Sequence, residues 1–293
     1  MIERVIEGHR RDLGGGMVVS RMLPVAQRRM IGPFVFFDHM GPIELAPGQG
    51  FDVRPHPHIG LSTVTYLYAG ENTHRDSLGN MVVNRAGDLN VMTAGAGIVH
   101  SERADPAFRQ RGGLMHGAQI WVALPEANED DAPSFAHHPE ATLPAIAPAD
   151  GVRGRVLIGA AFGARSPVVH PSAPVLVDLE LVAGARVAIA ADVAHERGVF
   201  VLAGELAIAG EVVAVDRAAV LAPDAEVTIV AATASRIIVL GGAAFPPRFI
   251  EWNFVGSSRE RIDRAKAAWR AQTMPKIPGD DQEFTPLPEP HAG

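Results

Sequence analysis

Residues 54–71, "RPHPHIGLSTVTYLYAGE", place two histidines, His56 and His58, directly before an alternating run that reaches a glycine-containing turn. Valine, threonine and tyrosine favour strands, and alternation of apolar and polar residues is typical of a half-buried strand. Because residues two apart on a strand point to the same face, both imidazoles would lie on one side of a sheet. The chain has 12 histidines, so a single pair at this spacing arises readily by chance and does not by itself define a metal site.

The rest of the chain repeats this arrangement of short strand-like runs and turns. The runs are rich in Val, Ile and Leu, and the 30 glycines and 23 prolines separate them. Examples are "AQIWVALP" (118–125), "PVLVDLELVAG" (174–184) and "SRIIVLGG" (235–242). Helical periodicity is scarce before residue 255, so the pattern predicts an all-β protein built of antiparallel sandwiches or barrels.

The two halves of the chain also resemble each other. "YLYAGE" at 66–71 is echoed by "FVLAGE" at 200–205, and both runs end at a glycine turn. A duplicated β-domain explains the echo. The stretch between the halves is rich in Ala, Pro and acidic residues and lacks a strand pattern, which is typical of a linker. The expected division is an N-terminal domain at 1–130, a linker at 131–150 and a C-terminal domain at 151–293.

One amphipathic helix is expected near the end of the chain, over "SSRERIDRAKAAWRA" (257–271). Ser257 and Glu260 have the spacing of a capping box. The apolar residues Ile262, Ala265 and Trp269 fall on one helical face, which predicts a helix packed on a sheet. From Met274 onward the chain is Pro-rich, and an extended tail is expected.

Composition excludes several classes of function. The chain has no cysteine, so disulfides, thiolate metal sites and cysteine nucleophiles are excluded. The net charge is −7 and no Lys/Arg-rich run occurs, which argues against direct binding of nucleic acid. No apolar run has the length of a signal peptide or a membrane span, so a cytoplasmic protein without membrane contact is expected.

A second motif strengthens the case for a metal site. "GAGIVHSE" (95–102) places His100 and Glu102 two residues apart. On a neighbouring strand this pair would face the same interior as His56 and His58. Three imidazoles and one carboxylate suit a divalent first-row metal and leave coordination positions open, as catalytic sites require.

The other histidines are weaker candidates. His74 and Asp76 have same-face spacing but adjoin a turn, so they would orient ligands rather than bind metal. His137 and His138 are adjacent, so on an extended chain they point opposite ways, and they lie in the expected linker. His116 with Gln119 is expected to be a hydrogen-bonded core pair, and His39 is expected to be structural. The second half contains no HxH pair and no counterpart of His100 and Glu102, so only the first half is equipped for metal.

These motifs resemble the pirin family of the cupin superfamily. The resemblance is most specific over 28–125, in "RRMIGPFVFFDHMGP", "HPHIGLSTVTYLYAGENTHRDSLGN" and "AGDLNVMTAGAGIVHSE". It extends to "FIEWNFVGSSRERIDRAKAAW" near the C-terminus and so covers nearly the whole chain.

The resemblance implies a bicupin, with two stacked antiparallel β-barrels or sandwiches and a short C-terminal helix. It implies one mononuclear metal in the N-terminal domain, held by His56, His58, His100 and Glu102. The family's usual metal is iron, so Fe(II) is expected at one per chain. Other divalent metals such as Mn, Ni or Cu fit the same donors, because affinity alone does not select iron.

Two functions follow from the resemblance. In the first, the protein is a quercetin-type flavonol 2,3-dioxygenase, with a flavonol-like aromatic substrate and O₂. Glu102, the one carboxylate among the four ligands, would be the catalytic base. Val64, Met92 and Ile98 are expected either to line the pocket or to belong to the core. In the second, the protein is a non-enzymatic, iron- or redox-dependent regulator that binds a transcription factor or a metabolic enzyme.

The sequence departs from the family pattern beside the metal motifs. Where the family has an "HPHRGFE"-like run, this chain reads Ile59, Gly60, Leu61 and Ser62, and Ala96 replaces a polar residue. If a pocket carboxylate or arginine assists the reaction, this chain lacks it. The departures therefore favour the regulatory function, while the four expected ligands suit both.

Overall fold

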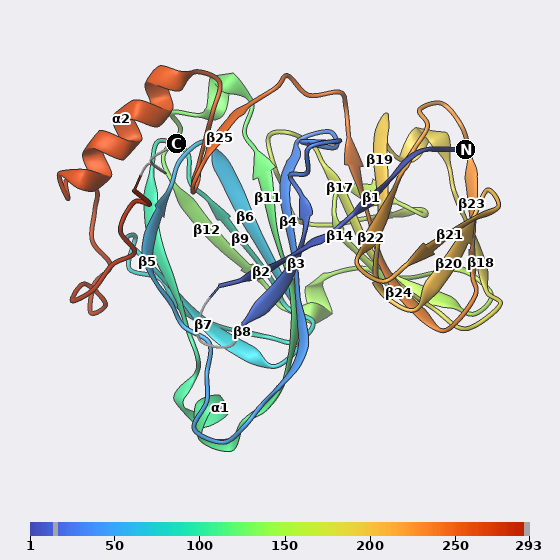
Figure 1. The fold of residues 1–293 in the computed structure, drawn as a ribbon, viewed down its shortest axis with the longest axis horizontal. Helices are drawn as coiled ribbons and strands as arrows, with labels where there is room; N and C mark the ends of the chain where they lie inside the picture. Colours follow the sequence, from blue (N-terminus) through green and yellow to red (C-terminus); the bar gives the residue numbers. More distant parts are fainter. Residues whose placement is uncertain (14–16, 290–293) are drawn as a thin grey trace. The chain divides into compact units, whose positions relative to one another are not determined.

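The computed structural model describes residues 1–13 and 17–289, and these form two compact units. Unit 1 comprises Met1–Asp12, Val18–His39 and His138–Phe245, and unit 2 comprises Leu13–Met17, Met40–His137 and Pro246–Gly293. Antiparallel strands dominate both units (Figure 1), which confirms the all-β fold expected from the sequence. The expected division of the chain into an N-terminal domain at 1–130, a linker at 131–150 and a C-terminal domain at 151–293 stays a prediction.

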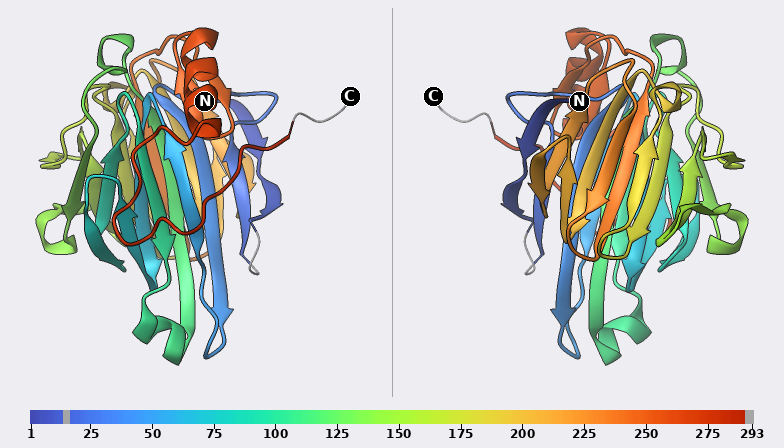
Figure 2. Two further views of the ribbon diagram at one scale, coloured as in Figure 1. Left: turned by 90° about the vertical axis from the view of Figure 1, so that its left-hand side faces the viewer. Right: turned by 90° about the vertical axis from the view of Figure 1, so that its right-hand side faces the viewer.

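Unit 1 is built of two sheets around one apolar core. Its larger sheet has the order β1-β22-β19-β24-β17-β14-β13. The bounds of these strands are Ile2–Glu7, Arg217–Leu221, Glu196–Ala203, Ser235–Gly242, Val175–Leu181, Val152–Ile158 and Ala145–Ala149. Neighbouring strands of this sheet are drawn side by side in yellow to orange in the right-hand view of Figure 2.

The smaller sheet of unit 1 has the order β18-β23-β20-β21. Its strands are Arg186–Ile189, Val227–Ala231, Glu205–Ile208 and Glu211–Ala214. Buried Val, Leu and Ile side chains from both sheets pack together in one cluster. Hydrophobic burial of this kind is the main driving force for folding.

Unit 2 also contains two sheets. One includes the consecutive strands β12-β9-β6-β11-β4, of which β4 belongs to unit 2 from Met40 onward, and the other, which we call the metal sheet, has the order β5-β10-β7-β8. The strands of the first are Ser134–His138, Leu89–Thr93, Leu61–Ala69, Gly113–Ala123 and Phe34–Leu45. Those of the metal sheet are Val53–His58, Ile98–Arg103, Glu71–Asp76 and Met81–Arg85.

Short elements complete the two units. In unit 1, β2 (His9–Asp12) pairs with β3 (Val18–Leu23), and β15 (Ala160–Ala161) pairs with β16 (Ala164–Arg165). In unit 2, β25 (Phe249–Glu251) pairs with β26 (Phe254–Gly256). The remaining elements are helix α1 (Pro106–Arg111) and the short 3-10 helices Glu126–Asn128, Glu140–Thr142 and Ala191–Val193.

Helix α2 (Arg259–Arg270) is the expected C-terminal helix, and it buries Ile262, Ala265 and Trp269 as predicted. It lies beside β25 and β26 (Figure 1). Its apolar face packs in one cluster with Val99 of β10 and with Ile59. Val99, on the outward face of β10, is therefore covered by apolar contacts, and the other face of the sheet carries the histidines.

The predicted helix cap is displaced by one residue. Ser258, not Ser257, is the N-cap, and its Oγ accepts a hydrogen bond from the backbone N–H of Arg261 at 3.4 Å. Ser257 Oγ instead donates to the buried carboxylate of Glu129 at 2.6 Å. With Ser258 as the N-cap, the third helical residue is Arg261, so the predicted capping box of Ser257 with Glu260 is wrong.

Candidate metal centre

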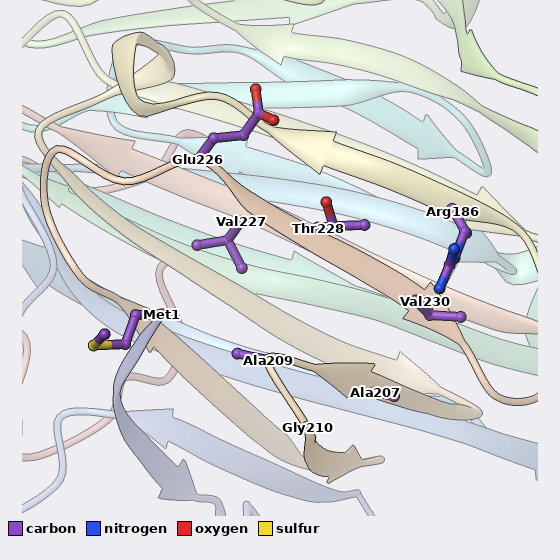
Figure 3. Close-up of a pocket in the computed structure, with 9 residues that line it drawn as sticks. All are labelled: Met1, Arg186, Ala207, Ala209, Gly210, Glu226, Val227, Thr228 and Val230. Atoms are coloured by element: carbon purple, nitrogen blue, oxygen red, sulfur yellow. The ribbon is translucent and has the colours of Figure 1, made fainter.

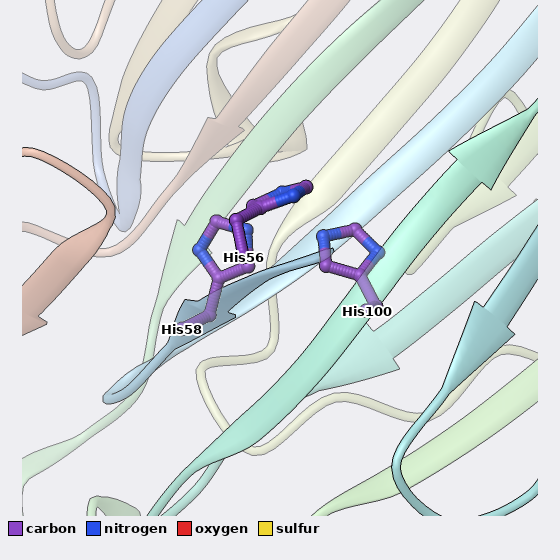
Figure 4. A group of neighbouring side chains, drawn as sticks. All are labelled: His56, His58 and His100. Carbon is purple, nitrogen blue, oxygen red and sulfur yellow. The ribbon is translucent and has the colours of Figure 1, made fainter. Parts of the chain in front are cut away.

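Pairing of β5 with β10 brings three histidines of unit 2 together. In this antiparallel pair His56 lies opposite His100 and His58 lies opposite Ile98, so all three imidazoles share one face. One nitrogen from each ring lies within 4.8 Å of the others, and the rings converge in Figure 4. The residues His56, His58 and His100 form the candidate metal centre, and such a group can hold a metal ion.

Hydrogen bonds orient two of the three imidazoles. His56 Nδ1 donates to the carbonyl of Arg54 at 2.8 Å, and His58 Nδ1 donates to the carbonyl of Asn253 at 3.0 Å. A carbonyl oxygen only accepts, so Nδ1 carries the proton and Nε2 keeps its lone pair for a cation. The Trp121 ring also packs edge-on against the His58 ring, with centroids 5.1 Å apart.

Burial keeps the three imidazoles neutral. It lowers the pKa of His56 to about 4, and it lowers the pKa of His58 and His100 well below 6.5, with neighbouring imidazoles adding to the effect. A neutral imidazole is the form that binds metal. Neither ring nitrogen of His100 has a hydrogen-bond partner among the described residues. Buried, unpartnered nitrogen lone pairs that face one another fit a bound cation.

Glu102 lies beside this group. Its Oε1 is 3.5 Å from His100 Nδ1, and its buried Oε2 has no hydrogen-bond partner in the described part of the chain. Burial raises the pKa of Glu102 to about 8, against the opposing effect of the Arg103 charge. A divalent cation would compensate a carboxylate in this setting. Glu102 is not in the group whose ligand atoms lie within 4.8 Å, so its role as the fourth ligand stays a prediction.

His74 and Asp76 flank the centre from strand β7. They lie opposite Glu102 and His100, and His74 Nε2 is 3.0 Å from Asp76 Oδ2. Burial acts to raise the pKa of Asp76, but hydrogen bonds from His74 and Asn80 hold it below its usual value. The His74 ring stacks on Phe135, with centroids 4.2 Å apart at an angle of 9°. The pair occupies a place from which it can support the ligands rather than bind with them.

The C-terminal tail supports the ligand strands, and nothing in the sequence motifs predicts this. Asp280 accepts hydrogen bonds from Ser101 Oγ at 2.7 Å and from Arg103 Nε at 2.9 Å, on either side of Glu102. The backbone N–H of Thr285 donates to the carbonyl of Pro55 at 2.8 Å, next to His56. The acidic run around Asp280 is the one sequence feature that could have indicated this contact, but acidic runs are common in Pro-rich tails and do not identify a partner.

The other predicted pairs lie away from the three histidines. His137 Nδ1 bonds Asn90 Oδ1 at 2.7 Å in unit 2, and His39 Nδ1 bonds Asp216 Oδ1 at 2.9 Å in unit 1. Both histidines are hydrogen-bonded within their units, in line with the structural role expected for His39.

Unit 1 offers a hollow of a different kind. It has a volume of about 450 Å³ and lies on the side of β18, β20 and β23 that faces away from the core of unit 1 (Figure 3). Its charged lining residues are Arg186 and Glu226, and none of the described lining residues is a histidine. Among the described residues, the histidine group that suits a metal therefore belongs to unit 2. Helices α1 and α2, the longest in the described ranges, are too short and too polar to cross a membrane.

Two cupin-type β units, of which one carries a buried three-histidine centre, define a bicupin with one candidate metal site among the residues that the structure describes. Profile comparison supports this class in detail, because the sequence profile described as Pirin matches residues 16–122. The profile described as the Pirin C-terminal cupin domain matches residues 176–275. The chain belongs to the pirin family.

Similar proteins are known in sequence and in structure. A pirin-like protein of Caulobacter vibrioides is 47% identical over 293 residues, which is 99% of this chain and 100% of the relative. The crystal structure of quercetin 2,3-dioxygenase from Acinetobacter baumannii superposes with a TM-score of 0.91 at 33% identity, over 99% of this chain and 96% of the other. The nickel(II) complex of the bacterial pirin YhhW from Escherichia coli has a TM-score of 0.64 at 19% identity, covers 84% of this chain and 100% of its own, and shares the fold.

Proposed function

We propose that this protein is a mononuclear Fe(II) dioxygenase of the quercetin 2,3-dioxygenase type. The observation that carries the proposal is the convergence of His56, His58 and His100 as neutral, buried imidazoles with Glu102 beside them. The similarity to the Acinetobacter baumannii enzyme supports the reaction class.

The proposed reaction takes up O₂, opens the heterocycle of a flavonol to a depside and releases CO. Bound iron would supply Lewis acidity towards the 3-hydroxyl and 4-carbonyl groups of the flavonol. The hydrogen bonds to the carbonyls of Arg54 and Asn253 hold the rings of His56 and His58 in the ligating orientation. Oε2 of Glu102, buried and unpartnered, would accept the proton of the 3-hydroxyl group.

Three of the departures from the family pattern, Ile59, Ser62 and Ala96, lie away from the face of β6 that carries Thr63. Ile59 packs with Phe254 and Trp269 in the cluster under α2, and Ala96 is exposed in the turn before β10. Ser62 Oγ bonds Thr93 Oγ1 at 2.8 Å, on the face of β6 opposite to that of Thr63, which pairs across to Trp121. The placement of these three residues supports the dioxygenase proposal over the purely regulatory alternative.

The test is anaerobic reconstitution with Fe(II), followed by exposure to air with quercetin while flavonol absorbance and CO release are recorded. We expect one CO for each flavonol consumed. Glu102→Gln keeps the size of the side chain but removes the carboxylate base, and it should slow turnover about 100-fold or more. Glu71→Gln, on the same sheet but close to Arg111 and Arg85, is the matched control and should turn over normally.

Iron content decides how a negative result is interpreted. If the protein holds about one iron per chain and still consumes no flavonol, the dioxygenase proposal is wrong and the iron-dependent regulatory function takes its place. If Glu102→Gln keeps both its iron and full turnover, Glu102 is not the base.

A further inference from the structure

A pair of buried amides continues the inner face of the metal sheet beyond the candidate metal centre. In the β7–β8 pair Asn72 lies opposite Asn84, two residues along the strands from the pair of His74 with Val82. His74 in turn lies opposite Glu102. Side chains two apart on a strand share a face, so both amides lie on the face that carries Glu102.

The amide groups are buried without partners. Asn84 is fully buried and Asn72 is 7% exposed. Neither Oδ1 nor Nδ2 of Asn84 has a hydrogen-bond partner among the described residues, and the same holds for Oδ1 of Asn72. Buried polar groups in native proteins almost always have partners, so two adjacent unpartnered amides on one face require an explanation.

The fold itself does not require amides at this place. In unit 1, strands β20 and β21 follow the same kind of glycine turn, and the corresponding opposite pair is Leu206 with Val213. Both side chains are fully buried in the apolar core. Apolar packing is therefore sufficient for this position of a cupin sheet, and the amides of unit 2 point to a ligand.

A third unpartnered amide lies on the sheet that faces them. Trp121 touches His58, and Phe135 stacks on His74, so the face of β11 that carries Trp121 is turned towards the metal sheet. Gln119 lies two residues from Trp121 on that face. Its Oε1 accepts from Thr65 Oγ1 at 2.9 Å, while its buried Nε2 has no partner in the described ranges.

The charge pattern favours neutral hydroxyl groups as the ligand's contacts. Glu71 and Arg85, the neighbours of Asn72 and Asn84, form an opposite pair on the other face of the strands, with 3.7 Å between Arg85 Nε and Glu71 Oε2. The inner face at this level thus presents amides, which both donate and accept, as a hydroxyl group does. A carboxylate or phosphate ligand would find no positive partner in this pair.

The position along the strand sets the length of the ligand. Asn72 is two residues from His74, which corresponds to about 7 Å of strand beyond the level of Glu102. A planar polyphenol that reaches the metal centre with one ring system would place its remote ring at this distance. Phe135, stacked on His74, supplies an aromatic surface next to this level, whereas Trp121 contacts His58 at the other end of the metal centre.

We propose that Asn72, Asn84 and Gln119 form a specificity subsite that binds the hydroxyl groups of the ring of a polyphenol remote from the metal. This inference rests on the proposed function and names its substrate class: flavonols hydroxylated on the B ring, in preference to flavonols without hydroxyls there.

The test measures binding rather than turnover. Iron-loaded protein is titrated without oxygen with quercetin and with galangin, a flavonol that has the same fused rings but no hydroxyl on the B ring. We expect the unmodified protein to bind quercetin about tenfold more tightly. Asn84→Leu should reduce the affinity for quercetin to the level of that for galangin, while the affinity for galangin stays unchanged. Asn72→Leu, an independent second variant, should have the same effect.

Val83→Ala is the matched control, since Val83 lies on the same strand but on its opposite face. It should keep the preference for quercetin, and iron content and thermal unfolding are recorded for every variant. The comparison of the two flavonols on the unmodified protein does not depend on any variant folding.

Four outcomes separate this inference from the dioxygenase proposal. A preference that disappears in the Asn variants supports the subsite, and it does so even if the protein then fails to consume quercetin in air, which would overturn only the reaction. Normal turnover with equal affinity for both flavonols overturns the subsite alone and assigns the amides to bound water. Absence of binding by either flavonol overturns both.

Discussion

The two cupin units share one strand–turn–strand pattern but differ in the side chains that follow the turn. In unit 2, strand β6 ends at Ala69, Gly70 has φ of 83° and β7 starts at Glu71; in unit 1, β19 ends at Ala203, Gly204 has φ of 79° and β20 starts at Glu205. Beyond these turns the interiors differ. The core cluster of unit 1 consists of apolar side chains, whereas the inner face of the metal sheet in unit 2 carries histidines, a glutamate and amides.

The difference separates a unit that is stabilised by apolar packing from a unit whose buried polar groups can bind a metal or a ligand. The apolar interior of unit 1 stabilises a fold that needs no ligand, while the polar interior of unit 2 leaves buried groups without partners. Such groups cost free energy unless a ligand or a metal meets them. The comparison predicts that substitutions at matched positions act in opposite directions in the two units.

The largest effect is expected on metal binding in unit 2. His58→Ala removes one of three converging imidazoles, and we expect iron affinity to fall about 100-fold or more, because the remaining donors no longer enclose the ion. Unfolding of the metal-free protein should change little. The measurement is iron content after dialysis, with His137→Ala, outside the group, as the control that keeps its iron. Full iron in His58→Ala would show that the site lies elsewhere.

Exchange of polar and apolar residues at matched positions should follow next in size. Leu206→Asn buries an unpartnered amide in the core of unit 1 and should lower the free energy of unfolding by about 3 kcal/mol. Asn72→Leu, at the matching position of unit 2, should leave the metal-free protein as stable as before or more so. Denaturant unfolding of both variants checks the pair, and equal destabilisation would remove the distinction between the two interiors.

The tail contact should have a smaller effect. Asp280→Ala removes the acceptor for Ser101 and Arg103 and should lower the free energy of unfolding by about 2 kcal/mol. It should also weaken iron binding, because both donors flank the ligands on β10. The control is Asp281→Ala, an exposed neighbour in the tail. Unchanged stability and iron affinity in Asp280→Ala would mean that the tail only covers the sheet.

The smallest effect concerns pH and a buried histidine of unit 1. Burial lowers the pKa of His170 to about 4, and its Nδ1 accepts from the backbone N–H of Ser172 at 3.1 Å. In the unfolded chain the His170 imidazole binds a proton near pH 6.5, whereas in the folded protein it does so only near pH 4. The stability contributed by neutral His170 is therefore fully present above pH 6.5 and is lost as the pH falls towards 4. Between pH 7 and 5.5 the loss is roughly 1 kcal/mol.

His170→Asn keeps an acceptor at this position but does not titrate, so its loss of stability between pH 7 and 5.5 should be smaller by that amount. Denaturant unfolding at the two pH values measures it, and His9→Asn, at an exposed site, serves as the control. An unchanged pH dependence in His170→Asn would show that His170 keeps its ordinary pKa in the folded protein.

The sequence predicted those parts of the site that depend on spacing along one strand. The HxH and HxE pairs share a face because a strand has a period of two, and the buried face of α2 follows from its 3.6-residue period. The echo of "YLYAGE" in "FVLAGE" likewise marks equivalent turns after β6 and β19. These features are local, so sequence alone was sufficient for them.

Other parts depend on contacts between distant segments, and spacing could not predict them. The carbonyl of Asn253 that orients His58 and the carboxylate of Asp280 behind Ser101 come from the C-terminal region. The amide pair of Asn72 and Asn84 is visible only once the register of β7 and β8 is known. Strand alternation also does not say which face is interior. Val64, expected at the pocket or in the core, lies on the face of β6 opposite to that of Thr63 and away from Trp121.

The most direct test of the account is the dependence of turnover on iron. Metal-free protein is loaded anaerobically with increasing amounts of Fe(II), and CO release from quercetin in air is measured at each level. We expect that activity rises in proportion to iron, saturates at one iron per chain and is absent from a His58→Ala protein treated in the same way. Saturation of the protein with one iron per chain, without any release of CO, would contradict it.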